Sequence, residues 1–451
     1  MNLQDTQTIH TAGVGTPTRR LPARWLFLAR VLWRIVAIYL MMLLAGGSTL
    51  PPRETITRRL AMVAAGHGFD VMSWQVNALA EKTDAFFRRP ARALDAPEQA
   101  ALVQAYLTRA RRIQELGHEI NGLLSASDGA RTGAVAALQL EIDALRAQQQ
   151  LDRSTVEQII EEQVGAILAA EGLAWGDKPL PPVKFSFVEP PKKLVVSPRE
   201  RIETLFGYMV DAAMTLEEVE QAEQTIRTEH GLSGYITGIG GLGAYPTMVI
   251  DNAGLPWILS TVAHEWVHNY LTFFPLGFNY GVNSENFTIN ETVAEGVGVE
   301  IGEAAVRRFC PQLAPPPTPP ADMAEFEAGG SELQGEGEDE SPPVFDFGAE
   351  MRITRLRVDE LLTADRIDEA ERYMEQRRLL FVEQGYPLRV LNQAYFAFHG
   401  SYGTGPASTS PLGPKLERLR QLTPNVKTYL QVVRSLLTPE DVDRALAEWE
   451  P

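Results

Sequence analysis

The sequence predicts a mainly α-helical chain with a small β-sheet, an α+β fold, and three observations support this class. Helical periodicity runs through most of residues 53–175 and returns over 349–383. Short strand-like segments occur within residues 184–252. Hydrophobic residues make up 45% and charged residues 22% of the 451 positions, which is typical of a folded globular protein.

The N-terminal segment has the pattern of a membrane anchor. Residues 1–22 are polar and without periodicity, so we expect a disordered tail there. Residues 25–44 are mostly apolar and about as long as a spanning helix, with arginines near the end that could reach the headgroups. We expect an uncleaved signal anchor over 23–50; the alternatives are a cleaved signal peptide and an amphipathic or buried helix. Five arginines precede or enter the apolar run and three follow it, which favours a single-pass protein whose remainder lies outside the cytoplasm.

A helical region is expected over 51–178. Residues 97–124 carry one apolar helical face, and the helix resumes over 134–150 after a Ser-Ala-Ser-Asp-Gly break. This pattern predicts an antiparallel helical hairpin, without a catalytic role. A third helix is expected to begin at Ser154, because Glu157 follows at the spacing of a capping box.

The next segment changes from helical to strand-like. Residues 184–188 and 193–196 have strand character, and 234–252 predicts one or two strands with interleaved glycines, which often mark close approach by another backbone. Residues 197–200, with serine followed by proline and then glutamate, predict a helix start, and Thr215 with Glu218 predicts another.

Charge and cysteine content exclude several classes of protein. The chain has 41 basic and 58 acidic residues, and a net charge of −17 disfavours nucleic-acid binding. Residues 311–347 hold nine of the acidic residues and no basic one, with many prolines and glycines, so we expect a disordered insertion within a domain spanning 179–451. The only cysteine, Cys310, permits neither an intrachain disulfide nor a thiolate zinc site.

The motif His264-Glu265-Trp266-Val267-His268 carries the strongest chemical signal. On a helix, the two histidines lie on one face about 6 Å apart along the axis, which lets both imidazoles bind one zinc ion. Glu265 could then act as general base toward a water molecule that the metal makes acidic. The alternative is a pair of partly buried histidines on a core helix.

A catalytic zinc ion needs a third protein ligand, and Glu291 is the candidate. It lies 23 residues after His268, on what we expect to be a second helix. Glu295, one turn further, could accept a hydrogen bond from the distal nitrogen of a ligating histidine. Small residues on the same helix would allow it to approach the first one closely: Ala294, Gly298 and Gly302.

Together these motifs resemble those of the gluzincin metallopeptidases, the thermolysin-like and aminopeptidase-N-like zincins. The resemblance covers about 180–310, with 349–410 as the helical C-terminal part of the same domain. It implies a zincin-like catalytic domain in which zinc is held by the two histidines and Glu291, with Glu265 as base. Thermolysin-like enzymes often have Asp where this chain has Glu295. Residues 240–248 lack the glutamate that binds the substrate amine in aminopeptidase-N-like enzymes, so amino- and endopeptidase activity both stay open.

Peptide hydrolysis also needs a hydrogen-bond donor for the tetrahedral oxyanion. The candidates are Tyr280, Tyr395, His399 and Tyr402, whose alternative role is aromatic packing in the core. The sequence thus predicts a membrane-anchored zinc peptidase acting on peptides or proteins. The alternative is a non-catalytic zinc-binding scaffold, an inactive zincin or helical adaptor, which would not need Glu265.

Overall fold

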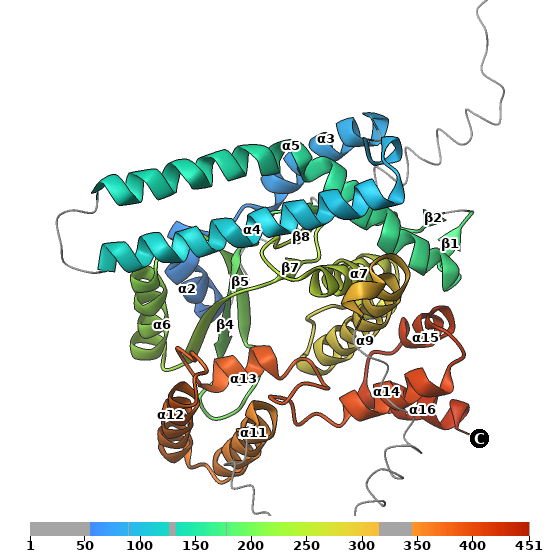
Figure 1. Ribbon diagram of the computed structural model, residues 1–451. Helices are drawn as coiled ribbons and strands as arrows, with labels where there is room; N and C mark the ends of the chain where they lie inside the picture. The colour runs from blue at the N-terminus through green and yellow to red at the C-terminus, as the bar shows by residue number, and fades with distance from the viewer. Residues whose placement is uncertain (1–54, 89, 126–131, 177, 315–344, 451) are drawn as a thin grey trace, which may run out of the picture. The chain divides into compact units, whose positions relative to one another are not determined.

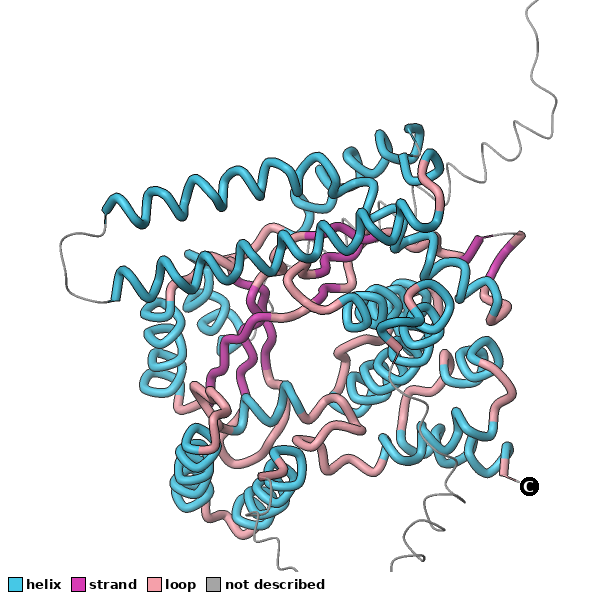
Figure 2. Tube along the Cα trace, in the orientation of Figure 1, coloured by secondary structure: helices cyan, strands magenta, loops and turns pink. Residues whose placement is uncertain are grey.

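The computed structural model describes residues 55–88, 90–125, 132–176, 178–314 and 345–450 (Figure 1). Helices make up most of these residues and the strands form three small sheets, which confirms the α+β class (Figure 2). The chain divides into two compact units, residues 1–58 and 59–451. The arrangement below is that of the second unit.

Three predictions fall mainly on positions outside the described residues. These are the tail over 1–22, the membrane anchor over 23–50 and, except for its ends, the acidic insertion over 311–347. Among the helices of the described ranges, none is both long and apolar enough to cross a bilayer. The anchor and the insertion therefore stay predictions.

The expected helical hairpin is present in the N-terminal half of this unit. Helices α4 (Ala96–Ser125) and α5 (Thr132–Ala170) run side by side in opposite directions (Figure 1). Helix α5 continues unbroken through Ser154, so the prediction of a helix start there is wrong. Glu157 does not cap a helix; its side chain is buried and accepts a hydrogen bond from the backbone N–H of Phe187.

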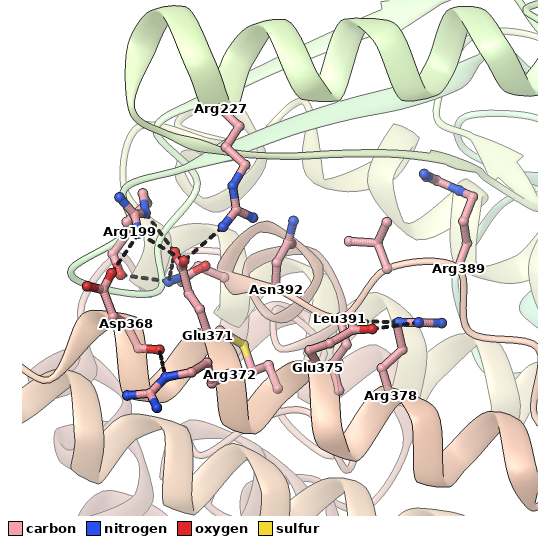
Figure 3. Close-up of a pocket in the computed structure, with 13 residues that line it drawn as sticks. Arg199, Arg227, Asp368, Glu371, Arg372, Glu375, Arg378, Arg389, Leu391 and Asn392 are labelled. Carbon is pink, nitrogen blue, oxygen red and sulfur yellow. Dashed lines mark hydrogen bonds and ion pairs between the residues drawn. The ribbon is translucent and has the colours of Figure 1, made fainter.

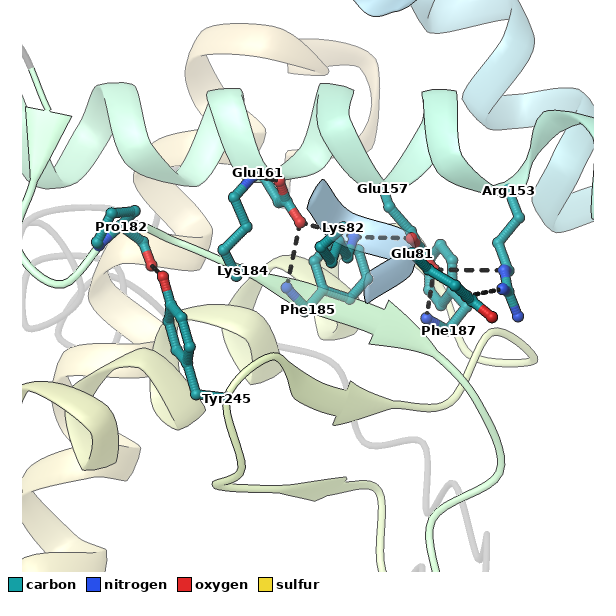
Figure 4. A network of polar contacts seen from close by, with 10 residues as sticks. All are labelled: Glu81, Lys82, Arg153, Glu157, Glu161, Pro182, Lys184, Phe185, Phe187 and Tyr245. Carbon is teal, nitrogen blue, oxygen red and sulfur yellow. Dashed lines mark hydrogen bonds and ion pairs between the residues drawn. The ribbon is translucent and has the colours of Figure 1, made fainter. Parts of the chain in front are cut away.

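Two carboxylates of α5 cover the open edge of a sheet. Strand β3 (Phe185–Phe187) pairs in parallel with β8 (Thr247–Val249), which pairs antiparallel with β7 (Gly241–Leu242). On the other side of β3, Glu161 and Glu157 accept from the backbone N–H groups of Phe185 and Phe187. Lys82 of α3 (Val71–Arg88) bonds the two carboxylates at 2.8 and 2.7 Å (Figure 4). Lys184 on Glu161 and Arg153 beside Glu157 help Lys82 to compensate the buried negative charge, and the helices are fixed to the sheet.

A second sheet has the antiparallel order β5-β4-β6, with β4 (Lys192–Ser197) in the centre between β5 (Phe206–Val210) and β6 (Ser233–Gly238). The helix predicted to start at 197–200 is absent. The Ser197 hydroxyl instead accepts from the Glu203 N–H at 3.2 Å, inside the loop that joins β4 to β5. Helix α6 (Leu216–His230) does begin at Thr215, and its capping box with Glu218 is confirmed. The sequence predicted one or two strands over 234–252, but three strands, β6, β7 and β8, lie at least partly in this range.

The remaining elements complete the unit. Strands β1 (Ala174–Trp175) and β2 (Lys178–Pro179) form a short ribbon. The C-terminal helices are α11 (Phe347–Thr363), α12 (Ile367–Glu383), α13 (Gln393–His399), α14 (Leu412–Leu422), α15 (Val426–Val433) and α16 (Pro439–Trp449). Short 3-10 helices occupy Ala65–His67, Pro90–Ala93 and Pro311–Leu313, and α2 spans Thr55–Ala64.

The main hydrophobic core crosses the domain boundary that we expected at residue 178. It contains Val156 and Ile160 of α5 together with residues of α7 (Leu255–Leu271), α9 (Ser284–Phe309) and the last three helices. The hairpin is therefore packed against the helices that carry the histidine motif, and it belongs to the same compact unit.

Helices α7 and α9 approach each other closely, as the small residues on α9 predict. A Cβ placed on Gly298 would lie 2.8 Å from the Cβ of His264, and one on Gly302 would lie 2.6 Å from the Cα of Ser260. Both contacts involve backbone or backbone-linked atoms of α7, which cannot rotate away. The glycines therefore set the spacing between the two helices.

We expect Gly298→Ala to lower the free energy of unfolding by about 1–3 kcal/mol, because α9 would have to move away from α7. Gly296→Ala is the matched control on the same helix, since a Cβ at this exposed position meets no atom within 4 Å. That control should be neutral or stabilising by up to about 1 kcal/mol, as alanine is the better helix former. Urea denaturation of the two variants measures the difference, and equal stabilities would contradict the close packing.

Candidate metal centre

Helices α7 and α9 bring the three predicted ligands together. The Nε2 atoms of His264 and His268 are 3.0 Å apart, and each lies 3.7 Å from Oε2 of Glu291. Of the His, Cys, Asp and Glu residues in the described ranges, these three form a group whose ligand atoms all lie within 4.8 Å of one another. Two nitrogens and one carboxylate oxygen form a donor set that suits zinc.

Local sequence explains the two helices. Helix α7 begins after Gly254 with Pro256 in its first turn, and apolar residues on several sides bury it in the core. Helix α9 begins at Asn283, whose side chain accepts from the Asn286 N–H at 2.7 Å. A rigid, buried pair of helices holds the ligand side chains more precisely than loops would.

Each ligand is oriented by a further polar group. His264 Nδ1 lies 3.4 Å from Oε2 of Glu295, the role expected for this residue. His268 Nδ1 lies 2.8 Å from the side-chain oxygen Oδ1 of Asn290, and the other carboxylate oxygen of Glu291 accepts from the Tyr280 hydroxyl. These contacts leave both Nε2 atoms free to bind a metal ion. The sequence interpretation missed Asn290 as a partner, although it stands directly before Glu291.

Glu265 lies beside the ligands and against the backbone of β7. Its side chain is buried, and a Cβ on Gly241 would lie 2.5 Å from Oε1 of Glu265. A glycine at this position therefore lets the strand run directly along the carboxylate, as the glycine pattern predicted. Burial raises the pKa of Glu265 to about 7, which His264 opposes and Glu291 reinforces. A carboxylate with a pKa near neutrality suits a general base.

The histidines and Glu291 share one electrostatic environment. Burial lowers the pKa of His268 to about 4. Burial alone would lower the pKa of His264, but the surrounding carboxylates raise it by more, so that the pKa is about 9. Burial raises the pKa of Glu291, yet the two histidines and Tyr280 more than offset this, so its pKa is below the ordinary value. Glu291 is therefore an ionised acceptor at neutral pH.

The ligands open into a cleft of about 930 Å³. The cleft is lined by residues of β4, β7, α7, α9 and the segment around α13, and it includes Tyr280, His399 and Tyr402. Tyr395 does not line it: this side chain is buried in the core between β6 and the C-terminal helices, where it packs against Tyr235. Tyr395 therefore has the packing role that we held as its alternative.

The two cleft tyrosines have different partners. The Tyr280 hydroxyl donates to Glu291, so it orients a ligand. The Tyr402 ring lies 6.4 Å from the His264 ring, centroid to centroid, and its hydroxyl bonds to no residue that the structure describes. Burial and the nearby carboxylates raise the pKa of Tyr402 well above its ordinary value. Tyr402 thus keeps its proton and has it free for a ligand.

His399 also lines the cleft, and its protein partner is weak. Its Nε2 is 3.4 Å from the Tyr235 hydroxyl, and burial lowers the pKa of the imidazole to about 4. The ring is therefore neutral at physiological pH. It can donate or accept a hydrogen bond with a ligand but does not carry a positive charge.

A second cavity, of about 590 Å³, is lined by arginines and acidic residues of α12 and neighbouring segments (Figure 3). These charges are already compensated within the protein. The carboxylate pairs are Arg199 and Arg227 with Glu371, Arg378 with Glu375, and Arg389 with Glu223, while Arg372 donates to the Asp368 carbonyl. The cavity holds no convergent set of free catalytic groups among the residues described.

Comparisons of this chain with protein-family models, with curated proteins and with solved structures found no match. The arguments about function therefore depend on the arrangement of the side chains in the cleft.

Proposed function

We propose that this protein is a zinc-dependent peptidase of the gluzincin type, with a zincin-like catalytic domain built around α7 and α9. The observation that carries the proposal is the convergence of the ligand atoms of His264, His268 and Glu291, with Glu265 beside them in an open cleft. A purely structural zinc site usually has four protein ligands and no need of a neighbouring base. Three ligands leave one coordination position for water or substrate.

The residues present fit a zinc ion. Each histidine presents Nε2, because its Nδ1 faces an acceptor, and Glu291 presents the oxygen that Tyr280 does not occupy. A bound zinc ion would lower the pKa of a water molecule and polarise a peptide carbonyl. The ligands, their orienting groups and the base all come from α7, α9 and the short segment between them.

The protein side chains would then divide the remaining tasks. Glu265 lies beside the ligands in the cleft, where its carboxylate would accept a proton from the attacking water and pass it to the leaving amine. The Tyr402 hydroxyl donates to the oxyanion that develops on the carbonyl. Neutral His399, further along the wall, can bind the polar backbone of a peptide.

We expect Tyr402→Phe to lower kcat by about 10- to 1000-fold with little change in KM, as for loss of an oxyanion donor. Tyr280→Phe should instead weaken zinc binding by about 10- to 100-fold, because the hydroxyl orients Glu291. Steady-state kinetics and zinc titrations of the two variants separate these roles. If Tyr402→Phe weakened zinc binding but kept kcat at saturating zinc, while Tyr280→Phe lowered kcat, the assignment of the two tyrosines would be reversed.

Digestion of a mixed peptide library by the zinc-loaded protein, read by mass spectrometry, tests the proposed function. Cleavage that stops on chelation and returns with zinc supports a peptidase, and the product ends distinguish amino- from endopeptidase activity. Stoichiometric zinc without cleavage of any peptide would favour the non-catalytic scaffold.

We also propose that residues 25–44 anchor the protein in the cytoplasmic membrane with the catalytic domain outside. The support is the apolar run and the arginine bias of its flanks. The full-length chain should sediment with membranes and need detergent for release, and external protease should digest the domain in spheroplasts. Recovery in the soluble fraction, or protection until lysis, would contradict the anchor or its orientation.

A further inference from the structure

We propose that Lys193 binds a carboxylate of the substrate, so that the cleft selects peptides with an acidic side chain or a free C-terminal carboxylate at one position. This inference rests on the proposed function, because it concerns ligands of the same cleft. The sequence interpretation assigned Lys193 only to a strand.

Lys193 lies on β4, and its side chain reaches the cleft that holds the metal ligands. Side chains alternate along a strand, so Lys193 shares a face with Val195, which packs in the cluster that includes α13. The ammonium group lies over two aromatic rings, 5.0 Å from the centre of Phe287 and 5.4 Å from that of Phe398. Phe287 stands one helical turn before Glu291 on α9, so the ammonium is close to the ligand face of that helix.

The ammonium of Lys193 is not neutralised by a direct contact. It makes no hydrogen bond or ion pair shorter than 4 Å with any residue that the structure describes, whereas Lys192 beside it donates to the carbonyls of Ala212 and Met214. Burial lowers the pKa of Lys193, and the charges of Glu291 and Glu265 oppose this effect. A partly buried cation held only by ring faces can gain substantially from a hydrogen-bonded anion.

The rest of the cleft determines what that anion would be. Among the described residues that line it, Lys193 is the only lysine or arginine, whereas Glu265, Glu291, Glu295 and Glu303 are acidic. A substrate carboxylate would be repelled along most of the cleft and attracted at Lys193. The preference should therefore be confined to one position of the peptide.

Binding to the zinc-loaded full-length Glu265→Gln protein tests this without requiring turnover. Calorimetry would compare neutral peptides with peptides carrying a single Asp at successive positions, each beside its Asn counterpart, and free C-terminal acids with amides. The two comparisons distinguish a side-chain from a terminal carboxylate. We expect one acidic position to tighten binding by about 10- to 100-fold, as for a charge-assisted hydrogen bond.

Substitutions of Lys193 in the Glu265→Gln background, with a control at Lys178, identify the cation. Lys193→Met keeps the apolar stem and should bring the ratio of acid to amide affinities close to one, and Lys193→Gln serves the same purpose if the methionine variant does not fold. Lys193→Arg should retain the preference. Lys178→Met removes the same charge at an exposed position outside the cleft lining and should leave the ratio unchanged.

Three outcomes would each overturn the proposal. The ratio could stay unchanged in both Lys193→Met and Lys193→Gln, the Glu265→Gln protein with Lys193 intact could show no acid preference, or no peptide could bind. Hydrolysis by the wild-type protein is scored separately. Acid-selective binding without hydrolysis would retain the role of Lys193 and refute the peptidase. Hydrolysis without acid preference would support the peptidase and refute the role of Lys193.

Discussion

Glu265→Gln is expected to lower kcat by about 100- to 10,000-fold, the range for loss of a general base, while one zinc ion per chain remains bound. The amide has nearly the shape of the carboxylate but cannot accept the proton of the attacking water. The fold should not suffer, because burial already disfavours the ionised form of this side chain. Kinetics at saturating substrate and metal analysis of the same preparation provide the two measurements.

Glu303→Gln is the matched control, since Glu303 lines the same cleft from α9 but is exposed and lies outside the ligand group. This change should leave kcat within about twofold, as is usual for surface substitutions. A zinc-loaded Glu265→Gln protein with wild-type kcat would refute the role of Glu265 as base.

His264→Ala and Glu291→Ala are each expected to abolish stoichiometric zinc binding, and with it activity. Two ligands remain in either variant, fewer than the three that catalytic zinc sites use. Zinc that binds only the native state at 1000 times its dissociation constant adds about 4 kcal/mol to the free energy of unfolding. The increase in melting temperature on adding zinc should therefore disappear in both variants.

His118→Ala is the control for these two variants, because His118 is exposed on α4 and does not line the cleft. After dialysis it should hold as much zinc as the wild type does, and atomic absorption measures this. Full zinc occupancy in either ligand variant would show that the ion binds elsewhere.

Local sequence signals predicted the convergence of the candidate ligand side chains better than they predicted the fold around them. The spacing of His264 and His268 specifies one helical face whatever packs around it, and the second helix with Glu291 and Glu295 could be recognised in the same way. The capping box at Thr215 is equally local and was also predicted correctly. Signals of this kind depend on residues within one or two turns of each other.

The errors arose where distant contacts decide the structure. Ser154 and Glu157 have the spacing of a capping box, but Glu157 accepts hydrogen bonds from the N–H of Phe187 and from Lys82. Lys82 lies 75 residues before Glu157 in the sequence. The hydroxyl of Ser197 closes a loop between strands instead of starting a helix. Lys193 was not recognised as a cleft residue, because only the tertiary structure places β4 beside Glu291 and Phe398.

The core shared by α5 with α7 and α9 has a consequence for synthesis. Val164 of α5 is buried in the same cluster as Val262 of α7, which follows 98 residues later in the chain. At roughly 5–20 residues per second, the ribosome needs about 5–20 s to make that interval. During this time the part of α5 that packs against α7 and α9 lacks these two helices, and contacts of long sequence separation also form slowly. The nascent chain should therefore depend on a chaperone during this interval, and early release would leave the hairpin prone to aggregate.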